Sequence, residues 1–325
     1  MAKNLRAVSL FSGCGGADLG LIGGFTFLGK KYKKNPISII HASDIDEKTV
    51  NTYNENFKHH AIVEDVCNLD FHGVDADIII GGFPCQNFST VNPTKVPEKK
   101  SNQLFWQMGK VVDDIKPKII IAENVKGFFT LKESYYYNMA KKSFEKSGYH
   151  VFSFILNAAD YGVPQKRERL VMIGIRNDLS VKTIEKPPCV FNNENQWIPL
   201  KKVIKSLIPE DEKYYFSKKA VDGVKKAKKN MKRAVAQDMN APCLTITSHL
   251  AKVSLNSRDP VLLVNKKKEL YRRFTTREAA RIQSFPEDFI FKGSGGDAYR
   301  QIGNAVPPVM MWHILKHVLT ILKKC

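Results

Sequence analysis

The sequence predicts an α/β fold in which a doubly wound sheet carries a second, smaller domain of mostly irregular or β structure. Three observations support this prediction. Strand-length apolar runs alternate with helix-length segments over the first 176 residues, as in doubly wound folds. The runs 77–80 and 118–122 are almost continuously β-branched, which is typical of strands buried on both faces. After Arg176 the alternation stops, and prolines, polar loops and lysines follow.

Each element follows from this alternation and from the turn residues between the runs. Strands are expected at Ala7–Leu10, Ile37–His41, Ala61–Val63, Asp77–Ile80, Lys118–Ala122, Val151–Leu156 and Arg169–Ile175. Helices are expected from about Ala17 and at Asp46–Phe57, Gln103–Ile115, Tyr135–Ser147 and Val309–Leu322. Gly148 ends one helix, and Thr275 or Thr276 caps a further short one that Pro286 follows.

Length and composition bound the architecture. A chain of 325 residues exceeds the usual size of one compact domain. We expect a first domain from residues 1–180 and 300–325, and a second from 181–299. The content of 43% hydrophobic and 26% charged residues indicates a soluble globular protein. No run of about 18 apolar residues and no signal peptide is visible, so we expect a cytoplasmic protein without a membrane span.

The net charge and the cysteines limit the kinds of partner and cofactor that the protein can be expected to bind. The net charge of +19 favours a polyanion, because neutralised phosphates release counterions. Most of the cations are lysines, so a compositional bias remains an alternative explanation. The six cysteines contain no C-x-x-C pair, which argues against a zinc module and a disulfide framework. No bound metal is expected.

Two motifs point to a bound ligand. The turn after the first strand reads FSGCGG (Phe11–Gly16), and its glycines let a ligand approach the backbone. Asp18 stands where a dinucleotide-binding motif has its last glycine, which weakens a nicotinamide assignment. Asp44 and Asp65 follow the next two strands and suggest an adenosine-containing ligand. As single residues they could equally be turn or cap residues.

A second group of motifs points to nucleophilic chemistry. The sequence GGFPCQ closes a buried strand, so Cys85 emerges at the edge of the sheet where ligands bind. A small buried residue in a turn is the alternative. A free thiol has a pKa of about 8.5, so a nucleophilic Cys85 needs a supporting environment. Glu123 ends the neighbouring strand, and side chains alternate along the following QKRER segment, so Arg167 or Arg169 can face the same cleft.

Six motifs occur together in one order: FSGCGG, GGFPCQNFS, AENV, QKRERL, TTREAARIQSFP and QIGNAVPP. This order resembles that of DNA (cytosine-5)-methyltransferases from bacterial restriction–modification systems. The similarity covers nearly the whole chain except residues 180–265. It implies a class I S-adenosylmethionine-dependent methyltransferase domain and, within residues 181–299, a target-recognition domain.

The resemblance also implies roles for individual residues. S-adenosyl-L-methionine would be the cofactor and S-adenosyl-L-homocysteine the product. The residues expected to form the cofactor site are Phe11, Ser12, Gly13, Gly15, Gly16, Asp44, Ile45, Asp65, Val66, Pro84, Leu104 and Asn304. Asp44 would take the ribose hydroxyls, although glutamate is the more common residue there. Asp65 and Val66 would contact the adenine.

For catalysis the resemblance implies that the Cys85 thiolate attacks carbon 6 of a flipped cytosine. Glu123 would hydrogen-bond or protonate ring nitrogen 3, Arg169 would hold the exocyclic oxygen, and Arg167 would assist. Carbon 5 then takes the methyl group, and β-elimination releases the enzyme. The DNA-contacting residues expected are Gln86, Ser89, Thr245 and Ile246, with residues 86–102 as a closing loop.

The implied partner is double-stranded DNA, with a restriction endonuclease as functional counterpart. We expect a monomer in the cytoplasm that is nucleoid-associated when bound to DNA. Lysines of the 218–233 stretch could grip phosphates or cover a solvated helix face. A tRNA cytosine-5 methyltransferase is one alternative, but the Cys-Phe-Thr signature and the smaller recognition region of those proteins are missing. A non-catalytic DNA-binding regulator is the other.

Overall fold

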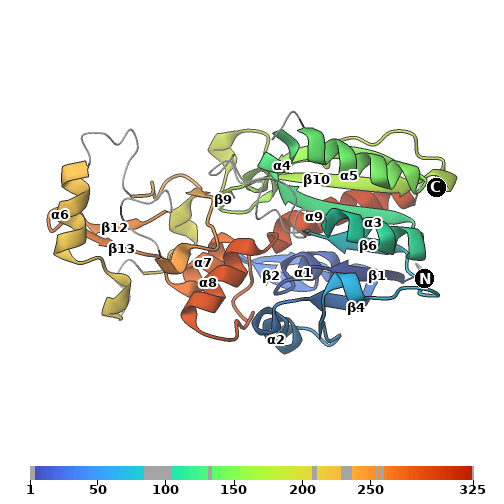
Figure 1. Cartoon of the computed structure of the whole chain (residues 1–325). Helices are drawn as coiled ribbons and strands as arrows, with labels where there is room; N and C mark the ends of the chain where they lie inside the picture. Colours follow the sequence, from blue (N-terminus) through green and yellow to red (C-terminus); the bar gives the residue numbers. More distant parts are fainter. Residues whose placement is uncertain are drawn as a thin grey trace.

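The computed structural model describes residues 4–83, 104–130, 134–206, 211–227, 236–252, 255 and 260–323 (Figure 1). A seven-stranded sheet forms its centre, in the order β5-β4-β1-β6-β7-β10-β8. The strands span Ile62–Val63 (β5), Ile37–Asp44 (β4), Leu5–Leu10 (β1), Ile78–Gly81 (β6), Ile119–Val125 (β7), Glu168–Arg176 (β10) and Tyr149–Asn157 (β8). Neighbours pair in parallel except β10, which is antiparallel to both β7 and β8.

The strand order reverses at β1, which pairs with β4 on one side and β6 on the other. Such a reversal opens a crevice at the carboxyl ends of the strands. The expected two-sided burial of β6 and β7 is confirmed, because Ile78, Ile79, Ile119 and Ile120 have no exposed surface. The sheet therefore directs the chain ends after β1, β4, β6 and β7 toward one edge.

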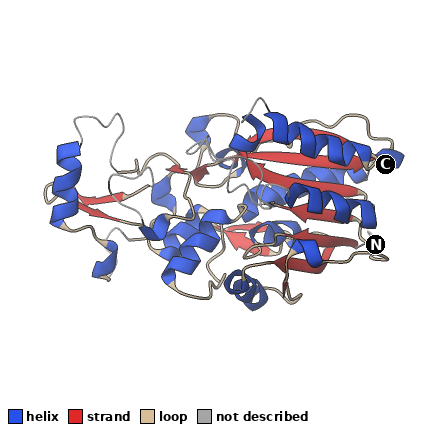
Figure 2. Ribbon diagram, viewed as in Figure 1, coloured by secondary structure: helices blue, strands red, loops and turns tan. Residues whose placement is uncertain are grey.

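Helices cover both faces of the sheet, which confirms the predicted doubly wound domain (Figure 2). One apolar layer includes residues of α1, α2 and α9, and the other includes residues of α3 and α5. The helices span Gly16–Ile22 (α1), Glu47–Asn56 (α2), Leu104–Ile115 (α3), Lys126–Thr130 (α4), Tyr135–Lys146 (α5) and Pro308–Leu322 (α9).

A short hairpin between α1 and β4 was not predicted. It consists of β2 (Phe25–Phe27) and β3 (Lys30–Tyr32). The Phe25 and Tyr32 rings stack with centroids 4.9 Å apart, and Tyr32 meets Trp312 of α9 edge-on at 5.3 Å. A strand of three residues is too short to show a clear alternation of apolar and polar residues, so the sequence does not predict this hairpin. It is recognised only from its packing in the structure.

The described residues between 177 and 272 are mostly irregular with short strands, as expected. Its elements are β11 (Cys243–Leu244), β12 (Leu262–Asn265), β13 (Leu270–Arg272) and α6 (Lys218–Ala227), and β9 (Gln165–Lys166) of the first domain pairs with β11. The described 3-10 helices are Val66–Asn68 (η1), Ala158–Tyr161 (η4), Asn177–Leu179 (η5), Glu194–Gln196 (η6), Leu200–Lys202 (η7), Glu212–Tyr214 (η8) and Leu250–Lys252 (η10). In Figure 1, α6, β12 and β13 form a lobe away from the sheet.

Helices α7 (Thr276–Ile282) and α8 (Gly295–Asn304) lie between this lobe and the sheet. Polar contacts attach the 290–301 region to α2: Thr52 Oγ1 donates to Gln301 Oε1 at 2.9 Å, and Asn56 Nδ2 donates to the Ile290 carbonyl at 2.7 Å. The boundary expected between residues 299 and 300 therefore falls inside one helix that packs on the first domain.

Within the described residues, the stretch 295–322 is apolar and long enough by composition to resemble a membrane span, with a hydropathy of 1.3. It consists of two helices, α8 and α9, separated at Ala305–Pro307. Helix α9 packs on α1 and buries Val309, Met310 and Ile314 completely. The apolar character of this stretch is accounted for by the protein core.

A buried ion pair fixes the start of α7. Arg272 is fully buried, and its Nη1 and Nη2 donate to Glu278 Oε2 and Oε1, each at 2.7 Å. Glu278 also accepts from Thr275 N at 2.8 Å, while Thr275 Oγ1 accepts from Glu278 N. Thr275 is thus the N-cap, with the reciprocal pair of bonds called a capping box.

We predict that Glu278→Leu lowers the free energy of unfolding by about 3–5 kcal/mol, because it removes the carboxylate that neutralises the buried Arg272 guanidinium. The control is Glu287→Gln, which removes an acid that pairs with Arg281 at the surface and should cost at most about 1 kcal/mol. Urea unfolding measures both. Equal losses in the two variants would show that the Arg272 pair has no special role.

Candidate active site

A buried carboxylate and a guanidinium meet at the carboxyl edge of the sheet. Glu123 of β7 pairs with Val171 of β10, two residues from Arg169, so Glu123 and Arg169 are diagonal neighbours across the two strands. Arg169 Nε lies 3.0 Å from Glu123 Oε1, and the side chains are only 11% and 12% exposed. The predicted meeting of Glu123 with an arginine is therefore present in the structure.

Burial raises the pKa of Glu123, while the charges of Arg169 and then Arg167 lower it. The net effect is an increase from the ordinary glutamate value, so the proton is held more tightly than at the surface. A carboxyl group in this state can donate a hydrogen bond to a ring nitrogen as well as accept one. Burial therefore favours the protonated form of Glu123, and the two arginine charges oppose it.

The last described residues before Cys85, Gly82 and Phe83, lie beside this pair. Cys85 itself, with Pro84, Gln86, Ser89 and the predicted closing loop 86–102, lies outside the described residues. Asn124 Nδ2 donates to the Phe83 carbonyl at 3.2 Å. A Cβ added to Gly82 would lie 3.3 Å from Glu123 Oε2. At Gly82, three residues before Cys85, the chain thus passes directly alongside the Glu123 carboxylate.

Arg167 is buried and contacts backbone rather than Glu123. Its Nη1 donates to the Ile246 carbonyl at 3.0 Å, and its Nη2 donates to the carbonyls of Gly303 and Ala305 at 2.9 and 3.1 Å. Burial, followed by the charge of Arg169, lowers its pKa. These contacts indicate that Arg167 positions the surrounding segments, whereas Arg169 faces the acid.

The two residues predicted to contact DNA in the second domain lie against β9. Thr245 is partly exposed, and its Oγ1 donates to the Lys166 carbonyl at 2.7 Å. The Ile246 side chain is 0% exposed and belongs to the larger apolar core cluster. Ile246 therefore offers no surface to DNA in this structure, and its predicted contact is corrected to a packing position.

The turn after β1 is held by the end of β4. Ser12 N donates to the Ser43 carbonyl at 2.9 Å, and Gly13 N donates to Asp44 Oδ2 at 2.9 Å. The other oxygen of Asp44 accepts from Asp46 N at 3.0 Å. Burial raises the pKa of Asp44, although these hydrogen bonds oppose the shift. Asp44 thus shapes the turn, and any contact with a ribose would be additional.

The three glycines of this turn have different surroundings. A Cβ at Gly13, where φ is +55°, would meet nothing within 4 Å. A Cβ at Gly15 would lie 2.3 Å from a ring carbon of Phe57, and one at Gly16 would lie 2.5 Å from the Val306 carbonyl. Only Gly13 therefore faces open space, and the other two glycines allow close packing within the protein.

The remaining predicted cofactor residues are distributed around the edge. Ile45 is 69% exposed, an unusual fraction for a large apolar side chain directly after a buried strand. Val66 is buried, and Asp65 caps η1 by accepting from Cys67 N at 2.9 Å. Phe11 and Leu104 are partly buried against one core cluster, and the exposed Asn304 ends α8. The edge thus combines open space at Gly13, an exposed apolar side chain and nearby carboxylates. This combination suits a ligand that has an apolar ring and a positive charge, such as a cationic adenosine derivative.

Asp18, which the sequence marks only as a departure from the dinucleotide-binding motif, lies fully buried beneath the turn. Its two carboxylate oxygens accept from Ser9 Oγ and from Tyr53 OH, each at 2.7 Å. Burial raises its pKa to about 6, and the two hydroxyl donors limit the rise. An acid within the apolar GADLGL segment was the available signal. Asp18 joins β1, α1 and α2 behind the ligand-facing surface.

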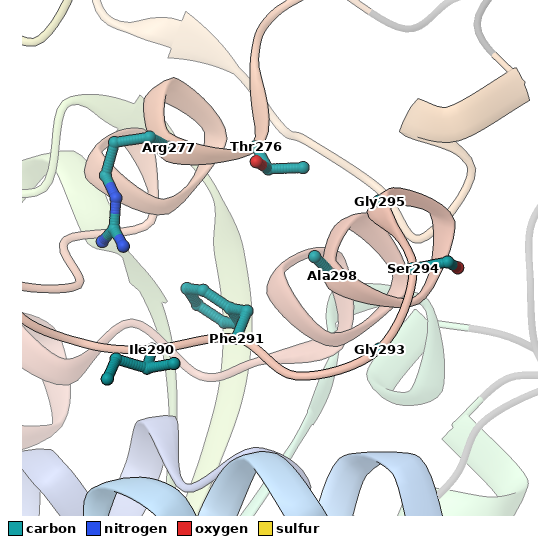
Figure 3. Close-up of a pocket in the computed structure, with 8 residues that line it drawn as sticks. All are labelled: Thr276, Arg277, Ile290, Phe291, Gly293, Ser294, Gly295 and Ala298. Atoms are coloured by element: carbon teal, nitrogen blue, oxygen red, sulfur yellow. The ribbon is translucent and has the colours of Figure 1, made fainter.

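A separate pocket of about 300 Å³ lies between α7 and α8 (Figure 3). Thr276, Phe291 and Ala298 are among its lining residues. Arg277 also borders it, but its guanidinium donates to the carbonyls of Pro286 and Phe289. None of the predicted site residues lines this pocket. Across the part of the chain that the structure describes, no group of three or more His, Cys, Asp or Glu residues could hold a metal.

Comparisons with known proteins agree with this geometry. The family model for C-5 cytosine-specific DNA methylases matches residues 5–320. Type II methyltransferase M.FnuDI of Fusobacterium nucleatum is 30% identical, in an alignment that covers 97% of this chain and 94% of the relative. Type II methyltransferase M.Sau96I of Staphylococcus aureus is 32% identical, with coverage of 98% and 76%.

Solved structures with less sequence similarity share the fold. A putative DNA modification methyltransferase encoded within an E. coli prophage aligns with a TM-score of 0.72 at 24% identity, covering 98% of this chain and 99% of that one. The S. pombe Dnmt2 methyltransferase aligns with a TM-score of 0.74 at 22% identity, covering 98% of each. These alignments confirm the predicted fold over nearly the whole chain.

Two glycine substitutions should distinguish a position that faces the ligand from one that packs inside the protein. Gly13→Ala places a methyl group in the open space and should weaken S-adenosylhomocysteine binding at least about tenfold, while backbone strain costs about 1–2 kcal/mol. Gly15→Ala should lose more stability, because its Cβ overlaps Phe57. Urea unfolding and titration calorimetry measure the two effects. Unchanged binding by Gly13→Ala would place the ligand elsewhere.

Asp18 should make stability depend on pH. Because its folded pKa of about 6 exceeds the ordinary 3.8, the folded state binds the proton more tightly. The free energy of unfolding should therefore fall as pH rises from about 4 to about 6, by up to about 3 kcal/mol. Asp18→Asn should abolish this fall, and Glu47→Gln, a surface change on α2, should retain it. A persistent fall in Asp18→Asn, measured by urea unfolding at several pH values, would contradict the assignment.

Proposed function

This chain belongs to the C-5 cytosine-specific DNA methylase family, and on that premise we propose how its residues methylate DNA. The enzyme is a DNA (cytosine-5-)-methyltransferase similar to type II enzymes of restriction–modification systems. The carrying observation is the buried Glu123–Arg169 pair beside Gly82 and Phe83, the last described residues before Cys85. A non-catalytic regulator has no need for such an arrangement, and neither alternative function is favoured.

In the proposed mechanism the Cys85 thiolate adds to carbon 6 of a cytosine that has left the helix. The electrons displaced toward ring nitrogen 3 need a proton or a strong hydrogen bond there, and Glu123 with its raised pKa supplies it. The result is an enamine whose carbon 5 is nucleophilic. Arg169, held against Glu123 at 3.0 Å, binds the exocyclic oxygen and fixes the ring orientation. Once carbon 5 has taken the methyl group, its original proton is lost to solvent and β-elimination breaks the bond from carbon 6 to the Cys85 sulfur, which leaves as the thiolate.

The cofactor is assigned to the edge around the Gly13 turn. S-adenosylmethionine, when bound, supplies the methyl group as an electrophilic sulfonium. Asp44 orients the turn through Gly13 N, and Ile45 provides exposed apolar surface for the adenine. Asn304 at the end of α8 and Leu104 at the start of α3 close the site. Phe11, Ser12, Gly15, Gly16, Asp65, Val66 and Pro84 complete the proposed set.

Double-stranded DNA binds across the recognition lobe, in this proposal. Gln86 and Ser89 contact the DNA near the flipped base, and Thr245 contacts it from the second domain. The positive charge of the chain supplies sequence-independent affinity. Flipping costs a few kcal/mol, which the contacts with the extruded base repay. Residues 181–275 carry recognition, and α7 and α8 belong to the catalytic side.

We assign the enzyme to the bacterial cytoplasm as a monomer without a metal cofactor. A restriction endonuclease that recognises the same DNA sequence is the proposed functional partner. Methylation of that sequence would protect the host DNA from cleavage.

The decisive measurement is base-resolution mapping of 5-methylcytosine on a plasmid from an unmethylated host that expresses the protein. We predict methylation at one short recurring sequence. Cys85→Ala should abolish it, because the variant lacks the thiol that forms the adduct at carbon 6. Cys189→Ala, a control at a half-buried thiol in the second segment, should leave it intact. A duplex with 5-fluorocytosine at the mapped base should trap a covalent complex, since fluorine cannot leave as a proton does.

Methylation by a soluble Cys85→Ala protein would refute the covalent mechanism. An unmethylated plasmid in the presence of soluble, folded wild-type protein would refute the DNA substrate itself.

A further inference from the structure

Two fully buried glutamines lie where the recognition segment meets the turn beside Asn304. Gln165 begins β9, Gln283 follows α7, and neither side chain is exposed. Gln165 Oε1 accepts from Ile246 N at 3.0 Å, and Gln165 Nε2 donates to Gln283 Oε1 at 2.5 Å. Gln283 Nε2 donates to the carbonyls of Ile302 and Ala305 at 3.0 and 2.6 Å. An unbroken chain of hydrogen bonds therefore joins Ile246 to the 302–305 turn.

Arg167 connects the same two segments in parallel. It donates to the Ile246 carbonyl and to the carbonyls of Gly303 and Ala305. Both backbone polar groups of Ile246 are thus held, one by Gln165 and the other by Arg167. A Cβ added to Gly303 would lie 2.2 Å from the Thr247 carbonyl carbon, so the two backbones touch with no side chain between them.

These contacts prevent the two segments from moving independently. Each buried donor or acceptor that loses its partner costs about 1–3 kcal/mol. A shift of residues 245–247 away from the 302–305 turn would break several such bonds at once. When a ligand shifts one segment, less free energy is lost if the other segment moves or becomes ordered with it than if the hydrogen bonds between them break.

We propose that Gln165 and Gln283 are positioning residues that couple DNA binding to cofactor binding. This inference rests on the proposed function, which assigns Thr245 to DNA and Asn304 to the cofactor. DNA that fixes residues 245–247 also fixes the turn that presents Asn304. The cofactor then binds an ordered turn and loses less conformational entropy. By linkage, the cofactor strengthens DNA binding by the same factor.

The test measures that factor directly. S-adenosylhomocysteine is titrated into the protein by calorimetry, with and without a short duplex carrying the sequence found by methylation mapping. The coupling factor is the ratio of the two dissociation constants. For the wild-type protein we expect a factor in the range of about 5–150. In Gln283→Met, which keeps the side-chain length but removes the hydrogen bonds, the factor should fall toward one, while each binary affinity changes much less.

The matched control is Gln301→Met. Gln301 is also a buried glutamine, but it accepts from Thr52 and donates to the Lys48 and Lys292 carbonyls. It therefore ties α8 to α2 and not to the recognition segment. Its substitution should cost similar stability and leave the coupling factor at the wild-type value. A purely structural role for Gln283 predicts the same behaviour in both variants.

A wild-type factor of one, or a wild-type factor retained by Gln283→Met, overturns the proposal. If Gln283→Met does not fold, Gln165→Met cuts the same chain at β9 and is judged by the same ratio. The two proposals can fail separately. If the wild-type protein methylates DNA normally but shows no coupling, or if Gln283→Met does not reduce the coupling factor, only the positioning role is refuted. If the wild-type protein does not methylate DNA, the proposed function itself is refuted.

Discussion

The Glu123–Arg169 pair depends on the direction of one strand. Parallel strands all deliver their last residues to the same edge, so β7 brings Glu123 there at its end. Because β10 runs the other way, it brings its first residues to that edge, and Arg169 is the second of them. A parallel β10 would have left the arginine at the opposite end of the sheet. The antiparallel direction of β10, which lies between β7 and β8, therefore brings Arg169 into contact with Glu123.

The sequence predicted the elements that have strong local signals. Continuous isoleucine runs identified β6 and β7, and the glycines marked the turn after β1. Glu123 could be inferred because a carboxylate directly after an apolar strand must lie at the ligand edge. Side-chain alternation predicted that Arg167 or Arg169 faces the same cleft, and the structure places Arg169 against Glu123. The placement of Cys85 stays a prediction, because that residue lies outside the described part of the chain.

Features that depend on tertiary contacts could not be predicted. The β2–β3 hairpin is defined by ring packing on α9, and the end of the recognition domain by side-chain contacts with α2. Ile246 was expected at the DNA because its neighbour Thr245 belongs to a familiar pair, yet burial decides its position. Asp18 and the two glutamines are polar residues in the interior. The partners of Asp18 lie nine and 35 residues away in the chain, and the two glutamines are 118 residues apart, so no local pattern reports these contacts.

The direct backbone contact between Gly303 and Thr247 limits how recognition lobes can be exchanged between relatives. A chimera whose junction falls within residues 243–248 would separate β11 from β9 and place a foreign main chain against Gly303. Because α6 precedes residues 243–248 and β12 and β13 follow them, an exchange that replaces the lobe on both sides and keeps 243–248 preserves this contact and the pairing of Cys243 with Gln165. A grafted lobe must therefore be joined to the host chain on each side of this seam.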